Sequence, residues 1–320
     1  MPLLDISNLA VSFHQGGGTV QAVRGISLSL DSGESLGIVG ESGSGKSVTC
    51  MAVLRLLREP PARITADRLM LDGIAMLQAG KRELAAIRGR VAAMVFQDPM
   101  TAFDPVFTIG HQIVETIRAH RPLALREAKV EARALLDRVR IKSPDAVLNS
   151  YPHQLSGGML QRAMIAMALS CQPKILLADE PTTALDVTIQ AQILDLIKEL
   201  QAELGMGLIM VTHDLGVVAE TVDRVLVMYG GLGMEQGPVQ TLFDAPAHPY
   251  TRALLASIPG RTPGKQRLVE IPGASPNPAN PPPGCPFHPR CTMAEARCST
   301  ERPPFRPIAP DRAAACWVLP

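Results

Sequence analysis

Apolar positions along the chain alternate between short continuous runs and helical spacings, and this alternation predicts the fold class. Helical spacing is clearest over residues 188–204, where apolar residues recur at steps of three and four and predict one buried helix face. Five continuous apolar runs are typical of strands buried on both faces: residues 35–39, 91–96, 175–178, 208–211 and 225–228. Strands that alternate with helices predict an α/β core with a mostly parallel sheet.

Two changes in the pattern predict the domain organisation. The stretch 109–170 contains helical patterns without comparable strand runs, so we expect an inserted helical subdomain over about residues 98–170. More than half of the 28 prolines lie within residues 259–320, which have little apolar periodicity. We therefore predict a core domain over residues 1–258 and a small proline-rich C-terminal domain over residues 259–320 with too little apolar surface for a core of its own.

Composition and charge exclude several classes of protein. The 320 residues carry 31 basic and 30 acidic side chains, and only 3% of the residues are aromatic, so we predict no nucleic-acid partner. No apolar run approaches the roughly 20 residues that cross a bilayer. The first ten residues contain an early Asp5 and no basic segment before an apolar block, so they do not resemble a secretory signal. These features predict a protein that remains in the cytoplasm.

Residues 40–47 predict a phosphate-binding loop. They read Gly40, Glu41, Ser42, Gly43, Ser44, Gly45, Lys46, Ser47 and match G-x-x-x-x-G-K-[ST], after a predicted strand and before a helical pattern. In such a loop the backbone N–H groups and the helix N-terminus form an anion-sized hollow. Lys46 is expected to reach the β- and γ-phosphates of ATP, and Ser47 to bind Mg²⁺.

An ATP hydrolase also needs a second side chain that interacts with the Mg²⁺ ion, and a residue that orients the attacking water. The run ILLADE ends a predicted strand with two carboxylates, Asp179 and Glu180. We expect the Asp179 carboxylate to accept hydrogen bonds from the ligand shell of Mg²⁺, and Glu180 to act as the general base. The alternative is a solvated pair of carboxylates at the end of a strand, which the upstream phosphate loop disfavours.

A second glycine-rich helix start lies at Ser156, Gly157, Gly158 and Met159. One ATP does not need two such sites from the same chain, so we predict that Ser156 and Gly158 bind the γ-phosphate held by another subunit's loop. The alternative, an ordinary N-cap by Ser156, explains the helix start but not the doubled glycine. His213 follows another predicted strand and is expected to contact the γ-phosphate, although a single histidine is more often structural.

Together these motifs resemble the ATP-binding subunits of ABC transporters. The resemblance rests on GESGSGKS, VFQDPMTAFDP, YPHQLSGGMLQR, ILLADEPTTALD and VTHD, and it implies a P-loop ABC ATPase with an N-terminal antiparallel β part. It further implies that Phe13 stacks on adenine, that Gln97 senses Mg²⁺ and touches a permease, that Asp186 forms the D-loop and that His213 is the switch histidine. Residues 230–233, Gly-Gly-Leu-Gly, replace a more polar turn and are expected to loosen a local hairpin.

The tail motifs PAHPYT, IPG and GCPFHPRC resemble the dipeptide and oligopeptide importer group. This implies an ATPase that energises peptide import at the cytoplasmic face of the membrane, bound peripherally. Its implied partners are two membrane permease subunits, a homologous second ATPase subunit that forms a heterodimer, and an extracytoplasmic solute-binding protein. Nickel or glutathione is an alternative cargo, and an ABC ATPase acting on nucleic acid or ribosomes is the alternative outside transport.

Four cysteines crowd into the tail and suggest a metal site: Cys285, Cys291, Cys298 and Cys316. Four thiolates can stabilise a segment that lacks a core, but their spacing alone does not choose between zinc and iron–sulfur. The resemblance to importer subunits with this tail implies a 4Fe-4S cluster, with zinc as the alternative and unmetallated thiols as a third reading. A structural role is expected, so that loss of one cysteine loosens the tail while the phosphate loop keeps its affinity for ATP.

Overall fold

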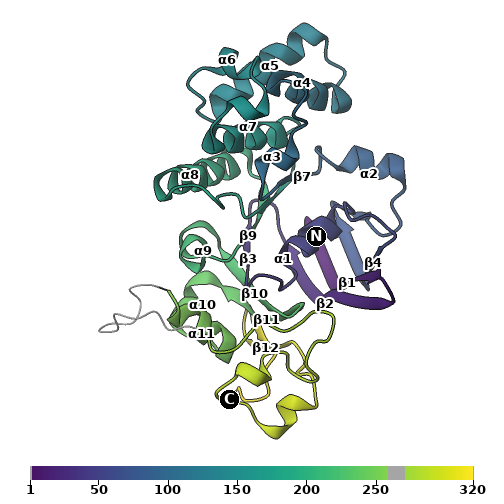
Figure 1. The fold of residues 1–320 in the computed structure, drawn as a ribbon, viewed down its shortest axis with the longest axis vertical. Coiled ribbons are helices and arrows are strands. Elements are labelled where there is room, and N and C mark those ends of the chain that lie inside the picture. Colours follow the sequence, from purple (N-terminus) through teal and green to yellow (C-terminus); the bar gives the residue numbers. More distant parts are fainter. Residues whose placement is uncertain (1, 259–270, 320) are drawn as a thin grey trace. The chain divides into compact units, whose positions relative to one another are not determined.

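The structure is a computed structural model that describes residues 2–258 and 271–319, which fall into two compact units. Unit 1 consists of the described residues of Met1–Asp31, Ser35–Gln78 and Met210–Pro320, and unit 2 of Ser32–Glu34 and Ala79–Ile209. Figure 1 shows the elements of both. Within the described residues, no helix has the length and apolar character needed to cross a membrane.

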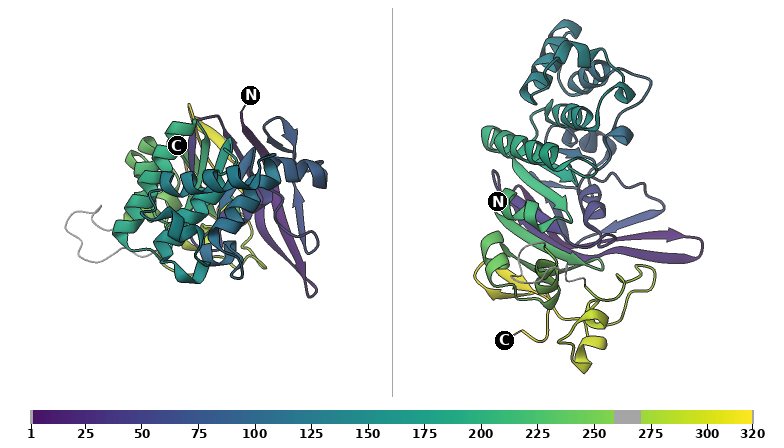
Figure 2. Two further views of the ribbon diagram at one scale, coloured as in Figure 1. Left: turned by 90° about the horizontal axis from the view of Figure 1, so that it is seen from above. Right: turned by 60° about the vertical axis from the view of Figure 1, so that its left-hand side comes forward.

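Unit 1 begins with an antiparallel sheet, as the resemblance implied. Its central strand β1 pairs with β2, β4 and β5, all antiparallel, and Figure 2 shows β1 and β2 as a long paired ribbon. Most core residues of β1 and β2 alternate with more exposed ones, which is typical of a sheet with one buried face. The strands are β1 (Leu4–Gln15), β2 (Gly18–Leu30), β4 (Ala62–Thr65), β5 (Arg68–Leu71) and β6 (Ile74–Ala75).

A second set of strands in unit 1 is mixed in direction. The pair β3 and β10 is parallel, whereas β10–β11, β11–β13 and β12–β13 are antiparallel. The expectation of a mostly parallel sheet therefore fits β3 and β10, but neither β11 of the predicted core domain nor the strands β12 and β13 that the tail adds. These strands are β3 (Ser35–Val39), β10 (Arg224–Tyr229), β11 (Leu232–Pro238), β12 (Arg306–Ala309) and β13 (Arg312–Ala314).

The helices of unit 1 are short. The predicted helical pattern after the phosphate loop gives α1, which ends at Val53 because Arg55 has a positive φ of 53° and residues 60 and 61 are prolines. The helices are α1 (Lys46–Val53), α9 (Leu215–Thr221), α10 (Val239–Asp244), α11 (Pro249–Ala256) and the 3₁₀ turns η2 (His288–Arg290) and η3 (Ala296–Ser299).

Unit 2 contains the predicted helical subdomain. In its fold α5 packs against α4, α6 and α7, and no strand interrupts residues 109–170. Parallel strands β7 and β8 lie beside this region in the chain, and β9 starts in unit 2 and ends in unit 1. The elements are β7 (Ala92–Val95), β8 (Ile175–Asp179), β9 (Gly207–Thr212), α2 (Lys81–Ile87), α3 (Pro99–Ala102), α4 (Ile109–His120), α5 (Leu125–Arg138), α6 (Pro144–Leu148), η1 (Pro152–Gln154), α7 (Gly157–Leu169) and α8 (Val187–Leu204).

The predicted amphipathic helix is α8. It starts at Val187, one residue before the predicted range, because the Asp186 carboxylate caps it by accepting the Ile189 N–H at 3.0 Å. Ile193, Ile197 and Leu200 are buried along one face, whereas Ile189 is only half-buried. The periodicity therefore located both the helix and its packing face correctly.

The C-terminal tail packs into the core of unit 1. The buried carboxylate of Glu235 on β11 accepts a hydrogen bond from Arg312 Nη2 at 2.9 Å and from the backbone N–H groups of residues 247 and 248. Tyr229, Tyr250 and Phe287 form a buried aromatic cluster with ring centroids 4.5–5.3 Å apart. The tail therefore has few apolar residues of its own, as expected, but it shares the core that β10, β11 and α11 provide.

The glycine-rich turn between β10 and β11 is tight, contrary to the expectation that it would loosen a hairpin. Gly230 and Gly231 both have positive φ, which a two-residue hairpin turn of this kind requires. A Cβ on Gly231 would lie 2.9 Å from the carbonyl oxygen of Ala22. The Gly231 N–H donates to the carbonyl of Ser44 in the phosphate loop at 3.1 Å. The glycines thus allow a close contact with the loop.

Candidate functional site

The predicted phosphate loop connects β3 directly to α1. Every residue of β3 is buried, and α1 begins at Lys46 after Gly45, which has a φ of +98°. A Cβ on Gly40 would lie 2.1 Å from the carbonyl oxygen of Met228, and a Cβ on Gly45 would lie 2.4 Å from that of Ala22. Both positions therefore exclude any side chain, because backbone atoms occupy that space.

Two side chains inside the loop fit a bound polyphosphate. Lys46 is buried, and its Nζ donates to the carbonyl oxygens of Gly40 at 2.8 Å and Glu41 at 3.1 Å. An ammonium group held this way lies within the loop and can exchange carbonyl contacts for phosphate oxygens. Within the part of the chain that the structure describes, the buried Ser44 Oγ has no hydrogen-bond partner, which is costly unless a ligand supplies one. The loop therefore fits a phosphate-bearing ligand such as ATP.

Glu180 and Gln97 lie side by side in unit 2. Gln97 follows β7, Glu180 follows β8, and because these strands are parallel their C-terminal ends meet at one edge. Gln97 Nε2 donates to Glu180 Oε2 at 3.1 Å, and Thr183 Oγ1 donates to the same oxygen at 2.9 Å. Glu180 has a φ of +45°, an unfavourable backbone for a residue with a side chain and one that often marks functional sites.

The other predicted nucleotide residues occupy defined positions in the two units. Asp179 ends β8 and is buried, so it is well placed to hold a cation at that strand end. His213 follows β9 and is exposed, and Phe13 lies half-buried on β1 opposite Val20 of β2. The phosphate loop and His213 belong to unit 1, whereas Gln97, Asp179 and Glu180 belong to unit 2.

The second glycine-rich motif opens α7 as predicted. Ser156 is its N-cap, and the Oγ accepts the Met159 N–H at 3.4 Å. A Cβ on Gly158 would lie 2.9 Å from Ile189 Cγ2 on α8, so one of the two glycines has a packing role that sequence reasoning missed. The start of α7 therefore packs against the start of α8, where Val187 is 84% exposed.

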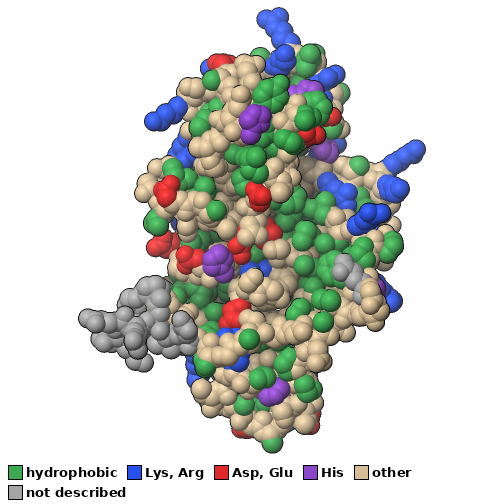
Figure 3. Space-filling view, viewed as in Figure 1, with side chains coloured by type: hydrophobic (Ala, Val, Ile, Leu, Met, Phe, Trp, Pro, Cys, Tyr) green, Lys and Arg blue, Asp and Glu red, His purple; other side chains and the backbone are tan. Residues whose placement is uncertain are grey.

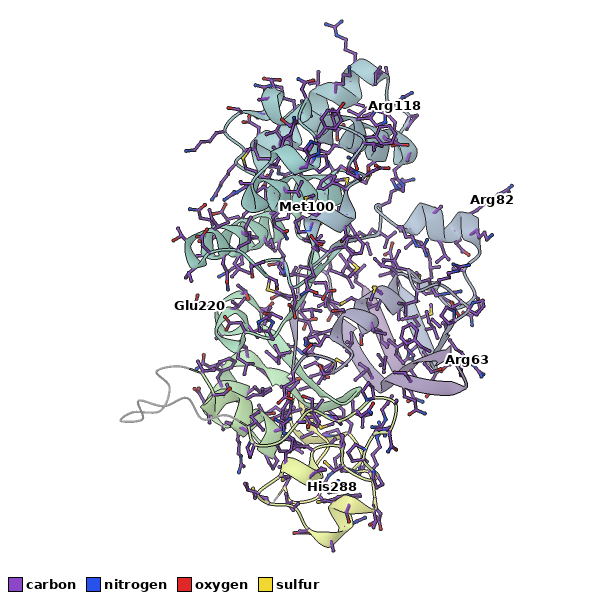
Figure 4. The ribbon with its side chains drawn as sticks, viewed as in Figure 1. Arg63, Arg82, Met100, Arg118, Glu220 and His288 are labelled. Atoms are coloured by element: carbon purple, nitrogen blue, oxygen red, sulfur yellow. The ribbon has the colours of Figure 1, made fainter. Side chains whose placement is uncertain are left out.

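The four tail cysteines line one small pocket together with His248 and His288, and Figure 4 shows where His288 lies in this segment. None of them forms a disulfide. Among the residues that the structure describes, no group of three or more His, Cys, Asp or Glu side chains is arranged to hold a metal ion. The structure therefore gathers the cysteines in one place without confirming the predicted cluster or zinc site.

The pKa values of three of these thiols show how they affect one another. Burial is the main cause that raises the pKa of Cys285 to about 11, and the nearby thiols of the other three cysteines raise it further. Burial likewise raises the pKa of Cys291 and Cys316. Buried thiols that disfavour one another's ionisation stay protonated near neutral pH, and a bound cation would reverse this by stabilising the thiolates. In the absence of such a cation, the structure favours the protonated thiols.

Sequence reasoning missed a network that connects the tail to the phosphate loop within unit 1. The carboxylate of Glu41 accepts a hydrogen bond from Arg290 Nη1 at 2.8 Å and one from the Ser275 hydroxyl, and the Glu41 N–H donates to the Tyr250 hydroxyl at 3.0 Å. The sequence near the loop gave no indication of this network beyond an acidic residue, Glu41, at one of the x positions of the motif. Its partners lie more than 200 residues away.

Comparison with protein families gives two matches. Residues 23–183 match the ABC transporter family, and residues 234–298 match the C-terminal region of oligopeptide/dipeptide transporters. The first range contains the phosphate loop, Gln97, the glycine-rich start of α7 and Glu180. The second contains Cys285, Cys291 and Cys298.

Individual relatives agree with these matches. A "Probable peptide ABC transporter ATP-binding protein" of Sinorhizobium fredii is 49% identical over 98% of this chain and 94% of its own length. The glutathione import ATP-binding protein of Escherichia coli is 55% identical over 80% of this chain and 42% of its own length. Among solved structures, a dimeric ATP-binding cassette in a post-hydrolysis state with ADP and phosphate matches 74% of this chain and 98% of that one, with a TM-score of 0.66 and 28% identity.

Proposed function

The chain belongs to the ABC transporter family and is an ATPase subunit of its peptide importers, and from this we propose that it energises the uptake of dipeptides or oligopeptides through two separate permease subunits. One observation carries the proposal: a single chain combines the phosphate loop with the peptide-importer tail, and a peptide-transporter relative matches both over 98% of the chain. The ATPase would act at the cytoplasmic face of the membrane.

The predicted site residues would each have a separate role in ATP hydrolysis. Lys46 and the N–H groups of the phosphate loop would bind the phosphates, and Ser47, Gln97 and Asp179 would hold Mg²⁺, which neutralises charge on the phosphate oxygens. Glu180 would take a proton from the attacking water, with its carboxylate oriented by Gln97 and Thr183.

His213 would contact the γ-phosphate, and Phe13 would stack on the adenine ring. His213 is exposed and Phe13 is half-buried, so both can reach a ligand. Asp186, already the N-cap of α8, would contribute the D-loop. These three roles rest on the family motifs that the residues occupy.

A second ATPase subunit would complete each site. Ser156 to Met159 start α7 with backbone N–H groups suited to an anion, and they would bind the γ-phosphate held by the partner subunit's loop. The exposed Val187 would be covered in that interface. Support also comes from the similar solved cassette, which is dimeric. We propose that the partner is a homologous subunit rather than an identical copy.

The surface that follows Gln97 suits contact with a permease. Apolar side chains are exposed there at Met100, Val106 and Phe107, with Val106 68% exposed, and Phe96 just before Gln97 is exposed as well. Figure 4 places Met100 on α3, and Figure 3 shows hydrophobic side chains among charged ones over the helical part of unit 2. Because Gln97 touches Glu180, a permease bound here would be linked to the catalytic carboxylate.

Cargo is tested by uptake. The chain is assembled with the permeases and partner ATPase encoded beside it and with their solute-binding protein, in vesicles that contain ATP. We expect labelled dipeptides or oligopeptides to accumulate. Because the glutathione importer is also a close relative, labelled glutathione is the competing cargo. Accumulation of glutathione but no peptide would replace the peptide assignment and leave the ATPase assignment intact.

The cysteine pocket is proposed to hold one 4Fe-4S cluster through Cys285, Cys291, Cys298 and Cys316. Their convergence on one pocket is the observation that supports a shared metal site. Protein isolated without air should contain iron and acid-labile sulfide at about four each per chain. Stoichiometric zinc without sulfide would replace the cluster with a zinc site.

A further inference from the structure

Arg290 is a charged tail residue that contacts the phosphate loop. It lies in the turn η2, and this turn is bracketed in sequence by Cys285 and Cys291. Its side chain is 7% exposed, and its Nη1 lies 2.8 Å from the Glu41 carboxylate, whose side chain is 22% exposed. The two residues are 249 positions apart in the chain, so the pair is a tertiary contact.

The guanidinium of Arg290 is held in place by several acceptors. Its Nη1 also donates to the Tyr229 hydroxyl at 3.0 Å, Nε donates to the carbonyl of Pro272 at 2.9 Å, and Nη2 donates to the carbonyl of Ile271 at 3.0 Å. Its carbon Cζ lies 5.8 Å from the centre of the Tyr229 ring. A side chain fixed at this many points presents its charge to Glu41 in one geometry.

The loop side of the contact is equally constrained. Besides Arg290, the Glu41 carboxylate accepts the Ser275 hydroxyl, and the Glu41 N–H donates to the buried Tyr250 hydroxyl. The carbonyl of the same residue accepts Lys46 Nζ. Glu41 therefore joins the tail to the lysine that is expected to reach the phosphates.

A carboxylate in this loop is electrostatically unfavourable for ATP. Glu41 and Lys46 belong to the same eight-residue loop, and the Glu41 carbonyl accepts Lys46 Nζ at 3.1 Å, so we expect the Glu41 charge to act on a triphosphate bound there. An unpaired negative charge at such a distance repels the phosphates, and the repulsion is strong where water is partly excluded. Arg290 cancels that charge and keeps the carboxylate engaged with the tail.

We propose that Arg290 is a positioning residue of the ATP site, which neutralises Glu41 and thereby lets the C-terminal tail set the affinity of the phosphate loop for ATP. This rests on the ATP site of the proposed function and adds a role for the tail. It also changes the sequence-based expectation that disturbing the tail leaves ATP affinity unaltered, because the turn that carries Arg290 is part of the cysteine segment.

The test measures the Kd of ATP on the purified full chain by calorimetry, without permeases. Arg290→Gln leaves Glu41 unpaired and should weaken ATP binding about tenfold. Glu41→Gln removes the repulsive charge and should bind ATP at least as tightly as the wild type. The double variant Glu41→Gln/Arg290→Gln should recover the affinity of Glu41→Gln within about twofold, since no charge is left to neutralise.

Two further measurements separate charge from folding. Raising the salt concentration should shrink the difference in Kd between Arg290→Gln and wild type, because ions screen the unpaired carboxylate. Arg290→Lys keeps the charge but gives up the forked contacts to residues 271 and 272, and should stay within about threefold of wild type. This second variant keeps the test decisive if Arg290→Gln does not fold.

The matched control is Arg297→Gln. Arg297 is another arginine of the tail, and it pairs with Glu301 at the same 2.8 Å distance; its contacts among the described residues are with the tail, including the Trp317 ring. Its loss should leave the Kd of ATP unchanged. A wild-type Kd in Arg290→Gln, or a double variant as weak as Arg290→Gln, would overturn the proposal. Absence of ATP binding by the wild-type chain would instead overturn the proposed function itself.

Discussion

The phosphate loop and the cysteine tail lie in the same compact unit but are specified in opposite ways. The loop is encoded by eight consecutive residues, and its shape depends on local backbone: Gly40 and Gly45 fit only because they lack a Cβ. The tail is held by partners distant in sequence, through Arg290 with Glu41 and Arg312 with Glu235. A ligand-binding loop can therefore be recognised from a short motif, whereas the residues that support it cannot.

Substitutions that disturb ATP hydrolysis, subunit assembly, protein stability and the tail one at a time test this contrast between the loop and the tail. The largest effect is expected for Glu180→Gln, which removes the general base and keeps Lys46 and Asp179. Turnover of the assembled transporter should fall by about 10² to 10⁴ while ATP still binds. Steady-state phosphate release beside a binding titration checks this. Glu199→Gln, on the exposed face of α8 and paired with Arg140, is the control, and near-normal turnover in Glu180→Gln would remove that residue from the mechanism.

Assembly is tested by Ser156→Arg. The substitution places bulk and a fixed charge at the start of α7, so it should block closure against a partner's nucleotide and abolish the stimulation of ATP hydrolysis by the permeases and partner ATPase. The phosphate loop of the same chain should bind ATP normally. Ser143→Arg, an exposed serine before α6, is the matched control. The wild-type chain alone should hydrolyse ATP poorly; full activity in a demonstrably monomeric sample would contradict the two-subunit mechanism.

Stability should depend on pH through His248. This residue is 1% exposed, and burial, aided by the charge of Arg252, lowers its pKa from 6.5 to about 4. The fold therefore favours neutral His248, so its contribution is complete above pH 6.5 and is lost as the pH falls through 6.5 towards 4. The expected loss between pH 7.5 and 5.0 is about 2 kcal/mol of unfolding free energy.

Urea unfolding of wild type and His248→Asn at both pH values checks this. Asn keeps an acceptor for the Tyr250 N–H, which the histidine ring caps at 3.0 Å, but does not titrate. His153→Asn, an exposed histidine of unit 2, should retain the pH dependence of the wild type. An equal slope in wild type and His248→Asn would show that the buried ring does not cause the effect.

The smallest effect concerns the link between tail and loop. Cys285→Ser should make the tail more sensitive to protease, because the Cys285 thiol is buried and its N–H pairs with the Cys298 carbonyl at 2.8 Å. Since Arg290 lies in the adjoining turn, the Kd of ATP should rise about threefold, a fraction of the effect of losing the charge itself. Limited proteolysis and calorimetry measure the two. Cys171→Ser, outside the tail, should change neither, and a protease-sensitive tail with unchanged Kd would support the purely structural role.

Sequence reasoning succeeded where local pattern determines structure. It located the strands β3, β7, β8, β9 and β10, the helix α8 and the glycine-rich start of α7, because burial on one or both faces leaves a periodic record. It missed β12 and β13, since Pro307 and the short polar runs there do not resemble strands. These strands form because β11 offers its edge to Ala313 and Ala314.

In the candidate site, too, the local motif could be predicted from the sequence, whereas the contacts between distant residues could not. The motif predicted a phosphate loop between a strand and a helix. It did not predict that the Ser44 hydroxyl would be buried without a hydrogen-bond partner among the described residues, or that the Gly231 N–H would donate to the Ser44 carbonyl. The Gln97–Glu180 contact follows from two parallel strands whose ends meet, which no linear spacing reveals. The cysteines were recognised by composition, whereas the arginine between two of them acquired meaning only from its contact with Glu41.

The central claim is that this chain hydrolyses ATP to drive peptide import, and peptide-stimulated hydrolysis tests it most directly. The complete transporter, with both permeases and the partner ATPase in vesicles, is supplied with its solute-binding protein either empty or loaded with peptide. We expect ATP hydrolysis to rise with the loaded protein, to fall by about 10² to 10⁴ in the Glu180→Gln variant, and to accompany accumulation of peptide in the lumen. ATP hydrolysis that is indifferent to peptide, with no accumulation, would contradict it.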